Sequence, residues 1–578
     1  MKKTKELIYQ TIIKLIFAFL YALFITLGDF DRVLAWSGMQ IAGRLAGWTV
    51  LAFLVLSVLF MAADFGTGGE TGFGRLMQRK QAGDRARQRN SGRYVYFLFA
   101  AVCFLCWLPY FLIYFPGWVS NDTVWQLEQA CGWVEPSNHH PWMHTMIIKA
   151  FFMLGFRIFR TYTGAVATFV FAQMVFMSLV YAVVLYDFYR RGVRRLWLAL
   201  AFIFYACLPV NGLYAICMGK DVLFAGILLL YAREVCRYGF RKAERAADKA
   251  QPTQGEGSLH NMEPGTIRRE KKDKYIRCRS WLQDNGNDIR IGILGLLVCM
   301  LRSNGILVFA GTAACMVAAG ILHKRWVRIT VCTVAVLACY MIYHGPVLRM
   351  LHVTQPDTIE GLTMPTQHLL CAYLNGGEVT EEEAAILGEV VPMEYIASYY
   401  NPYYFDIVKE YIRSEGNQQV IADNKGKYLA LWARVGLRNP ARYLEAEVRQ
   451  TCGYWCFDMN EPIYEQYRMA ENPFELTTQR KVFSYDFGLW MDDFLMKFQD
   501  SYNKVWSLGL TTWTMLACMA YALYRRKSCL VYLPYGMLFL SLLLATPVHA
   551  EFRYTYGMFV ALPFLIGITL EKGTPEEK

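Results

Sequence analysis

Long apolar runs recur along this chain, and they constrain its fold more than any other feature of the sequence. Several of them reach the roughly 20 residues that an α-helix needs to cross a hydrocarbon core of about 30 Å. Lipid offers no hydrogen-bond partners, so each crossing must satisfy its own backbone polar groups, and such spans must be helices. The composition agrees, because 55% of the 578 residues are hydrophobic and only 18% are charged. The sequence therefore predicts an all-α polytopic membrane protein.

The apolar runs and the basic segments between them together predict about 12 transmembrane helices with both termini in the cytoplasm. The first run, near residues 7–27, exceeds a signal-peptide core and lacks a cleavage site, so we interpret it as a retained span. Basic residues gather in segments 75–93 and 241–290, which the positive-inside rule assigns to the cytoplasm. The run 146–159 carries basic residues such as Lys149, so we predict that it lies at the membrane surface instead of crossing.

This topology divides the chain into seven segments. They are three spans with a basic cytoplasmic loop (1–115), a first external catalytic loop with an interfacial helix (116–163), three further spans (164–240), a flexible cytoplasmic linker (241–288), three spans with an external RSNG turn (289–345), a mainly helical external domain (346–505), and three C-terminal spans with a cytoplasmic tail (506–578).

Two of these segments carry further local signals. Acidic residues outnumber basic ones in 346–505, the reverse of the cytoplasmic segments, which favours an external domain. Within that domain, Pro440 after Asn439 indicates the start of a helix. At RSNG the sequence allows either one long helix or two crossings joined by a tight turn, in which Gly305 relaxes the backbone.

Several common classes of function are not expected. The net charge of +12 does not predict a nucleic-acid partner, because membrane orientation accounts for the basic segments and no basic strip carries interleaved stacking aromatics. The chain contains no phosphate loop and no GxGxxG dinucleotide fingerprint. Four of the 16 cysteines lie outside the predicted spans and linker, and one or two disulfides among them are left open: Cys131, Cys371, Cys452 and Cys456.

Polar residues that are costly near lipid emerge on the predicted external face, and their shared placement predicts a functional site there. Asp122 follows the span 94–115 directly, and Lys220 precedes a later span. The other candidate residues at this face are Asn121, His139, His140, His144, Asp221, Arg302, Asn304, Glu551 and Arg553. Each of them taken alone is also explained as an interfacial anchor or a helix cap.

The residue types at this face suit the transfer of a sugar from a lipid phosphate to an acceptor hydroxyl. A carboxylate that takes the acceptor's proton lowers the barrier, and Asp122 is the candidate general base. The departing phosphate needs cations that are already in place, for which Lys220, Arg302 and Arg553 are the candidates.

A divalent metal is compatible with the site but is not favoured. His140 and His144 are four residues apart and share one face if the helix begins early, and with Asp122 they suit zinc or manganese. Their spacing matches neither a closed four-ligand site nor HExxH. The cofactor requirement is therefore left unknown, and the histidines are predicted to bind substrate.

The first external loop, YFPGWVSNDTVWQ followed by SNHHPWMHT, resembles the GT-C class of integral-membrane glycosyltransferases. Those enzymes carry a catalytic acidic residue soon after a span, often followed by a His-Pro pair. LLVCMLRSNGILVF resembles their short hairpin before a donor-side turn, and HAEFRYTYGMFVALP resembles their Arg-Tyr segment entering a late span. More closely, the FPG, ND and NHHP spacing is similar to an uncharacterised family of Gram-positive bacterial membrane proteins.

The GT-C resemblance implies a polyprenyl-phosphate sugar donor, and an envelope glycan, lipid or protein as the acceptor. It also implies a multi-pass protein of the bacterial plasma membrane. The loop departs from the mannosyltransferase pattern, because Asp122 stands alone where those enzymes have an Asp-Glu pair. This departure leaves the sugar, the acceptor and any metal dependence open.

Two other classes of protein fit a polytopic chain. A transporter or lipid flippase is the first, although the chain shows neither paired halves nor charges in the middle of most spans. A non-catalytic protein of cell-envelope assembly is the second, and such a protein tolerates loss of Asp122. We expect a transferase that works in the lipid bilayer.

Overall fold

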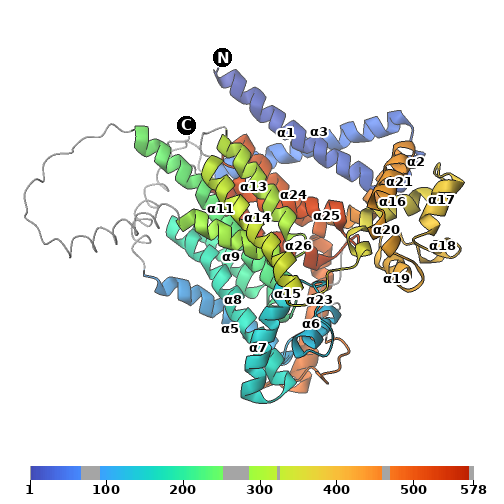
Figure 1. Ribbon diagram of the computed structural model, residues 1–578. Helices are drawn as coiled ribbons and strands as arrows, with labels where there is room; N and C mark the ends of the chain where they lie inside the picture. The colour runs from blue at the N-terminus through green and yellow to red at the C-terminus, as the bar shows by residue number, and fades with distance from the viewer. Residues whose placement is uncertain (1, 67–91, 251–285, 322–325, 458–468, 572–578) are drawn as a thin grey trace, which may run out of the picture.

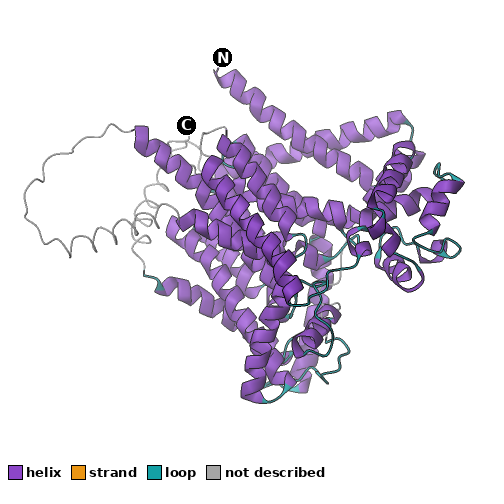
Figure 2. Ribbon diagram, in the orientation of Figure 1, coloured by secondary structure: helices purple, strands orange, loops and turns teal. Residues whose placement is uncertain are grey.

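The computed structural model describes residues 2–66, 92–250, 286–321, 326–457 and 469–571. Regular elements within these residues are all helices, and strand-like pairing is limited to four isolated bridges (Figure 2). The predicted all-α fold is therefore confirmed. The basic loop predicted at 75–93 and most of the predicted linker at 241–288 lie outside the described residues.

Seven helices among the described residues are long and apolar enough to cross a membrane. They are α1 (Lys2–Gly28), α3 (Gly38–Gly66), α5 (Tyr94–Ile113), α7 (Trp142–Phe159), α8 (Tyr162–Arg191), α14 (Trp326–Ile342) with its continuation to Met350, and α26 (Phe552–Leu570). Shorter apolar helices are α13 (Gly305–Ile321), α24 (Leu508–Tyr524) and α25 (Leu533–Ala545). A polytopic membrane fold is confirmed, and the total of about 12 spans stays a prediction. So does the surface placement of α7, whose length also allows a crossing.

Buried aromatic residues join the helices α5, α8, α9 (Arg195–Cys207) and α26. Helix α11 (Lys220–Ala250) packs against α26 in the same bundle (Figure 1). The hydroxyl groups of Tyr181 and Tyr556 lie 2.9 Å apart, and the Tyr205 hydroxyl donates to Val560 O at the same distance. Trp107 Nε1 donates to Tyr205 O (3.2 Å). Each aromatic ring thus contributes apolar area while its polar atom keeps a partner.

Ion pairs mark one end of this bundle. Arg191 at the end of α8 pairs with Glu571 after α26 (2.8 Å), and Arg233 near the middle of α11 pairs with Asp187 (2.6 Å). Helices α8 and α26 therefore finish at the end that α11 reaches near its middle, and the first residues of all three helices point toward the other end. We call that other end, where α6 (Asn121–Cys131), α11 and α26 begin, the site end.

A bent pair of helices leads into the site end. α9 (Arg195–Cys207) and α10 (Pro209–Ile216) meet at an angle of 43°, and every residue of α10 is buried. The carbonyl groups left without helical partners at the break are hydrogen-bonded by side-chain amides, so α10 can be buried. Asn211 Nδ2 donates to Phe204 O (2.7 Å), and Gln173 Nε2 donates to Cys217 O (2.7 Å).

The RSNG sequence forms a tight turn between two helices. One helix covers 286–301, and α13 begins at Gly305. The structure therefore has two helices joined by a tight turn, and not one long helix. A Cβ atom at Gly305 would lie only 1.9 Å from Val298 O. Glycine is required here because the backbones of the two helices touch.

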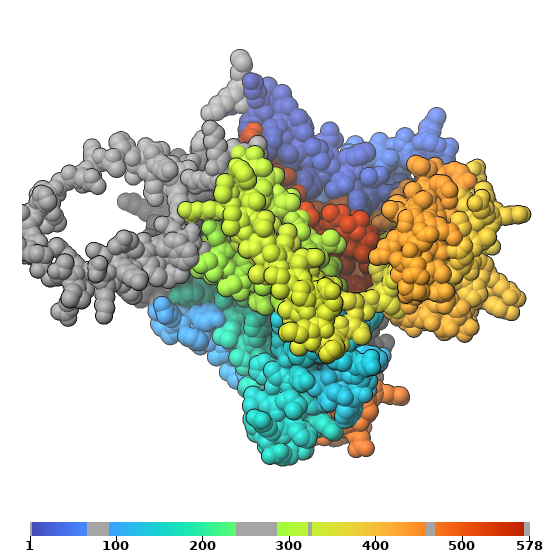
Figure 3. Space-filling view, viewed as in Figure 1, coloured from blue at the N-terminus to red at the C-terminus, as the bar shows by residue number. Residues whose placement is uncertain are grey.

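The predicted external segment 346–505 packs as two parts. The first is a side lobe over residues 358–451, which holds α16 (Thr363–Leu374), α17 (Glu381–Gly388), α18 (Ile396–Tyr399), α19 (Asp406–Glu415), α20 (Gln419–Asp423), α21 (Lys425–Arg438) and α22 (Pro440–Thr451). The side lobe has its own small cores and stands beside the bundle in yellow and orange (Figure 3). The second part ends in α23 (Tyr485–Val505) and buries residues such as Phe474 and Leu495 in the main core.

Candidate functional site

The extended stretch before α6 is paired with the stretch before α11. Trp118 N donates to Ile216 O (2.9 Å), and Met218 N donates to Trp118 O (2.9 Å). These bonds hold the starts of α6 and α11 side by side. Asp122 and Lys220, which are 98 positions apart in the chain, consequently face each other.

Gly117 makes this pairing sterically feasible. Its φ is +119°, a backbone conformation that side chains with a Cβ rarely adopt. A Cβ atom there would lie 2.7 Å from Val170 Cγ2 and 2.8 Å from Ile216 O. The glycine of the FPG sequence therefore allows the chain to pass close to α8 and to the stretch before α11.

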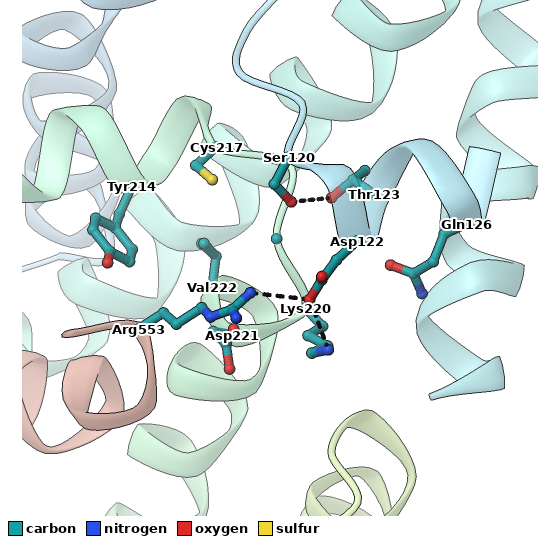
Figure 4. Close-up of a pocket in the computed structure, with 11 residues that line it drawn as sticks. Ser120, Asp122, Thr123, Gln126, Tyr214, Cys217, Lys220, Asp221, Val222 and Arg553 are labelled. Carbon is teal, nitrogen blue, oxygen red and sulfur yellow. Dashed lines mark hydrogen bonds and ion pairs between the residues drawn. The ribbon is translucent and has the colours of Figure 1, made fainter. Parts of the chain in front are cut away.

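The Asp122 carboxylate lies between two cations from other helices. Its Oδ2 accepts from Lys220 Nζ (3.1 Å) and from Arg553 Nη1 (2.9 Å), as Figure 4 shows. Lys220 Nζ also lies 3.0 Å from His140 Nδ1, and Arg553 Nε lies 2.5 Å from Glu551 Oε1. The first loop, the start of α11 and the start of α26 thus share one polar network.

Three helices begin at this network. Asp122 is the second residue of α6, Lys220 is the first residue of α11, and Arg553 is the second residue of α26. Each helix start carries backbone N–H groups without intrahelical partners and a partial positive charge of about half a unit. The electrostatic field at the site therefore favours an anion.

The charges around Asp122 keep it ionised. Burial acts to raise the pKa of its carboxyl, but the nearby charges of Lys220 and Arg553 outweigh burial and hold that pKa well below its usual range. Burial, followed by the charge of Lys220, lowers the pKa of His140 to about 2. Its ring is therefore neutral at pH 7 and accepts from Lys220. The pKa of Glu551 is raised, because burial outweighs the attraction of Arg553.

A second ion pair lies behind the first. Arg302 Nη1 is 2.9 Å from Asp221 Oδ1, and both side chains are buried. The Arg302 guanidinium also lies over the Tyr554 ring, 4.7 Å from its centroid. Asp221 lines the pocket beside Asp122, and Arg302, which binds Asp221, is not part of the lining.

Four of the predicted residues lie apart from the network. His139 Nδ1 lies 3.9 Å from Glu360 of the side lobe, and the Asn304 amide donates to Ser541 (2.8 Å). His144 is fully buried beneath α6, and Asn121 is exposed at its start. The residues that come together are Asp122, His140, Lys220, Asp221, Arg302, Glu551 and Arg553.

The pocket also contains residues that the sequence analysis missed. Gln126 follows Asp122 by one helical turn, and its Oε1 lies 3.0 Å from His144 Nδ1 while its Nε2 donates to Thr145 (2.9 Å). The i, i+4 spacing from Asp122 was a usable signal for Gln126. The other unpredicted lining residues, which no local pattern indicated, are Ser120, Thr123, Tyr214, Cys217, Gly219 and Val222.

The arrangement gives little support to the metal alternative. In the described ranges, no three His, Cys, Asp or Glu side chains gather closely enough to hold a metal ion. Lys220 Nζ lies between Asp122 and His140, where an ion bound by both would have to sit. Of the cysteines considered for disulfides, Cys131 and Cys371 are free thiols.

The side lobe is tied to the bundle on both sides of the site. Asn138 N donates to Thr354 O (2.8 Å) in the loop before the lobe. Phe405 N donates to Pro547 O (2.9 Å), and His549 N donates to Tyr403 O (2.9 Å), just before Glu551. The lobe and the loop before it are therefore attached both to the loop that contains His139 and His140 and to the stretch that leads to Arg553.

Comparison with known protein families identifies the family of this chain. A family model described as a family of unknown function, DUF6020, matches residues 136–576, which is most of the chain. The chain belongs to DUF6020. The DUF6020 match includes Lys220 and Arg553, and Asp122 precedes it. No curated protein and no solved structure matches the chain.

Proposed function

We propose that this protein is an integral-membrane glycosyltransferase that moves a sugar from a polyprenyl-phosphate donor to a hydroxyl of a cell-envelope glycan, lipid or protein. The observation that carries the proposal is the Asp122 carboxylate, bound by Lys220 and Arg553 where three helices begin. The protein is multi-pass in a bacterial plasma membrane, with both termini cytoplasmic and the site end external.

The donor phosphate is the ligand that this site suits best. Lys220 and Arg553 carry N–H groups that bind phosphate oxygens, and the three helix starts add partial positive charge. At rest, Asp122 occupies both cations. A phosphate that binds them takes the place of the Asp122 carboxylate.

This exchange gives Asp122 its role. A carboxylate with so low a pKa is a weak base, because it holds a proton poorly. When Lys220 and Arg553 turn to the donor phosphate, the pKa of Asp122 rises and the carboxylate becomes able to take a proton. Donor binding thereby prepares the base for the acceptor.

The proposed reaction is a single displacement at the anomeric carbon. The acceptor oxygen forms a bond to this carbon and passes its proton to Asp122, while the bond from the carbon to the phosphate oxygen breaks. The polyprenyl phosphate leaves with the electron pair and is stabilised by Lys220 and Arg553. Arg302 acts through Asp221, whose orientation it holds.

One observation favours a second candidate, lipid or solute transport. Transporters use discontinuous helices at their binding sites, and α9 and α10 form such a pair. Here the freed carbonyl groups are bound by Asn211 and Gln173 instead of facing a cavity. The transferase is therefore the better account.

Thermal unfolding in nanodiscs tests the ligand class. Undecaprenyl phosphate should raise the Tm by several degrees, because a ligand that binds only the folded state stabilises it. Undecaprenol, which lacks the phosphate, should not. Lys220→Met should abolish the shift, whereas Lys497→Met, at an exposed lysine on α23, should keep it. The proposal that the site binds the donor phosphate would be contradicted by equal Tm shifts with undecaprenyl phosphate and undecaprenol. Equal Tm shifts in Lys220→Met and Lys497→Met would contradict it as well.

A further inference from the structure

Helix α23 carries three different faces. Gly488, Met491, Leu495 and Gln499 are buried against the bundle at spacings of three and four residues. A second stripe at the same spacing is aromatic: it begins at Phe483, just before the helix, and continues through Phe487, Trp490, Phe494 and Phe498. A third stripe is charged and exposed, and consists of Asp486, Asp493, Lys497, Asp500 and Lys504.

The aromatic stripe is continuous and partly open. Successive ring centroids lie 4.8 Å apart from Phe483 to Phe487, 5.3 Å from Phe487 to Trp490, and 5.7 Å from Trp490 to Phe494. Trp490 is 55% exposed and Phe494 is 39% exposed. Phe483, Phe487 and Phe498 are partly buried against the main core. Two open aromatic rings beside these partly buried ones indicate a surface that binds something apolar.

Both ends of α23 are fixed at the site end of the bundle. Before the helix, Gln479 N donates to Phe115 O (2.6 Å) and Lys481 N donates to Leu112 O (2.8 Å), at the end of α5. At its other end, Trp506 packs on Phe559, two turns into α26. A helix of 21 residues is about 30 Å long. α23 therefore runs across the site end of the bundle instead of through the membrane.

A chain of aromatic contacts, partly buried, leads from the stretch before α23 to the candidate spans. Lys481 Nζ lies over the Phe115 ring, which contacts Phe111 of α5 at 5.4 Å. Phe111 in turn contacts Phe171 of α8 at 6.5 Å, and Phe171 is 48% exposed. The aromatic stripe thus adjoins the surface that α5 and α8 present to lipid.

We propose that α23 lies in the interfacial layer of the membrane at the site end, with its aromatic stripe against lipid and its charged stripe in water. Aromatic rings beside a charged face are typical of helices that lie at the boundary between headgroups and acyl chains. The occupant of the stripe is the lipid surface. This assignment does not depend on the proposed reaction.

The position of α23 sets the depth of the site. The Tyr114 hydroxyl donates to Asp492 of α23 (2.7 Å), and Arg480 binds the other oxygen of the same carboxylate (3.2 Å). Tyr114 directly precedes the stretch that leads to Asp122. A helix anchored at headgroup level therefore holds Asp122 near that level, where a lipid headgroup reaches it.

Photocrosslinking in nanodiscs tests the assignment. p-Benzoylphenylalanine is introduced at Trp490 on the aromatic stripe, at Lys497 on the charged stripe, and at Leu105, an exposed residue of α5 that serves as the lipid-facing standard. After irradiation, intact mass measures the fraction of protein that carries a phospholipid. We expect the Trp490 position to approach Leu105 and to exceed Lys497 severalfold.

Two outcomes would overturn the proposal. The first is a lipid adduct at Trp490 no more frequent than at Lys497, with Leu105 labelled. The second is a crosslink from Trp490 to another copy of this chain, which would make the stripe a dimer contact. If the Trp490 variant is not monodisperse, the same comparison is made at Phe494, which lies one turn further along the stripe.

Discussion

Asp122 and Arg553 are 431 positions apart in the chain, and yet their carboxylate and guanidinium groups meet at 2.9 Å. Both residues are the second of their helices, so the contact brings the starts of α6 and α26 together. Lys220 completes the arrangement from the start of α11 (3.1 Å). The site at rest is thus a carboxylate that is paired with two cations, and an incoming anion must compete with it.

Loss of Arg553 should weaken donor binding. In Arg553→Gln, one of the two cations that receive the phosphate is gone, and a charge-assisted hydrogen bond contributes about 1.5–3 kcal/mol. We expect KM for a lipid-phosphate donor to rise on the order of 10- to 100-fold, measured by initial rates in nanodiscs. Arg349→Gln, at an exposed arginine, is the control and should match wild type. Equal KM values in Arg553→Gln and Arg349→Gln would show that Arg553 does not bind the donor phosphate.

Acidification should destabilise the protein through His140. The folded-state pKa of His140, about 2, lies below its ordinary value of 6.5. Between these values the unfolded chain binds a proton that the folded chain does not, so the His140 contribution to stability is complete above pH 6.5 and falls as the pH drops. We expect the Tm of wild type to fall more steeply from pH 6.5 to 4.5 than that of His140→Gln. A steeper or equal slope in His140→Gln would contradict a buried neutral ring.

Asp221 and Arg302 should show strong coupling in stability. Arg302→Met leaves the Asp221 carboxylate buried without its cation, which costs about 3–5 kcal/mol for such a pair. Asp221→Asn combined with Arg302→Met removes both charges and should recover most of the loss in chemical denaturation. Additive losses in the double variant would show that the two side chains do not form this pair.

Gly117→Ala should damage both the fold and the site. The new Cβ would contact Ile216 O at 2.8 Å in a backbone conformation that alanine rarely adopts. We expect a destabilisation on the order of 3 kcal/mol or more, together with loss of activity as the pairing of Trp118 shifts. Gly536→Ala is the control, because no atom lies within 4 Å of its added Cβ. Similar Tm values for the two variants would refute the role of Gly117.

Local patterns predict much of the helical architecture. Length and apolarity identify the candidate spans, and α22 begins at Pro440 as the sequence indicates. The RSNG hairpin was one of two alternatives, because a glycine between apolar runs does not say how closely two backbones approach. The burial of α10 was missed for a related reason. The carbonyl groups of Ala215 and Cys217 are bound by the amide of Gln173, which comes from α8, a neighbour in space and not in sequence.

The site was only partly predictable. Membrane topology predicts Asp122, Lys220 and Arg553 on one face, since each is polar at the end of an apolar run. Their contacts depend on the pairing of Trp118 with the stretch before α11, which no local pattern encodes. The external domain was predicted from the excess of acidic residues in 346–505, and this count does not reveal the aromatic stripe of α23.

The proposed glycosyl transfer, with Asp122 as its general base, is tested by measuring transfer of labelled sugar from a panel of undecaprenyl-phosphate sugars. The purified protein is assayed in nanodiscs. Wild type is compared with Asp122→Asn, which keeps the shape of the side chain, and Asp493→Asn at an exposed carboxylate of α23 is the control. We predict turnover of one donor by wild type and by Asp493→Asn, and a loss of about 10²- to 10⁴-fold in Asp122→Asn, as expected when a general base is removed. Turnover that survives in Asp122→Asn, or no turnover of any donor by folded wild type, would contradict the account.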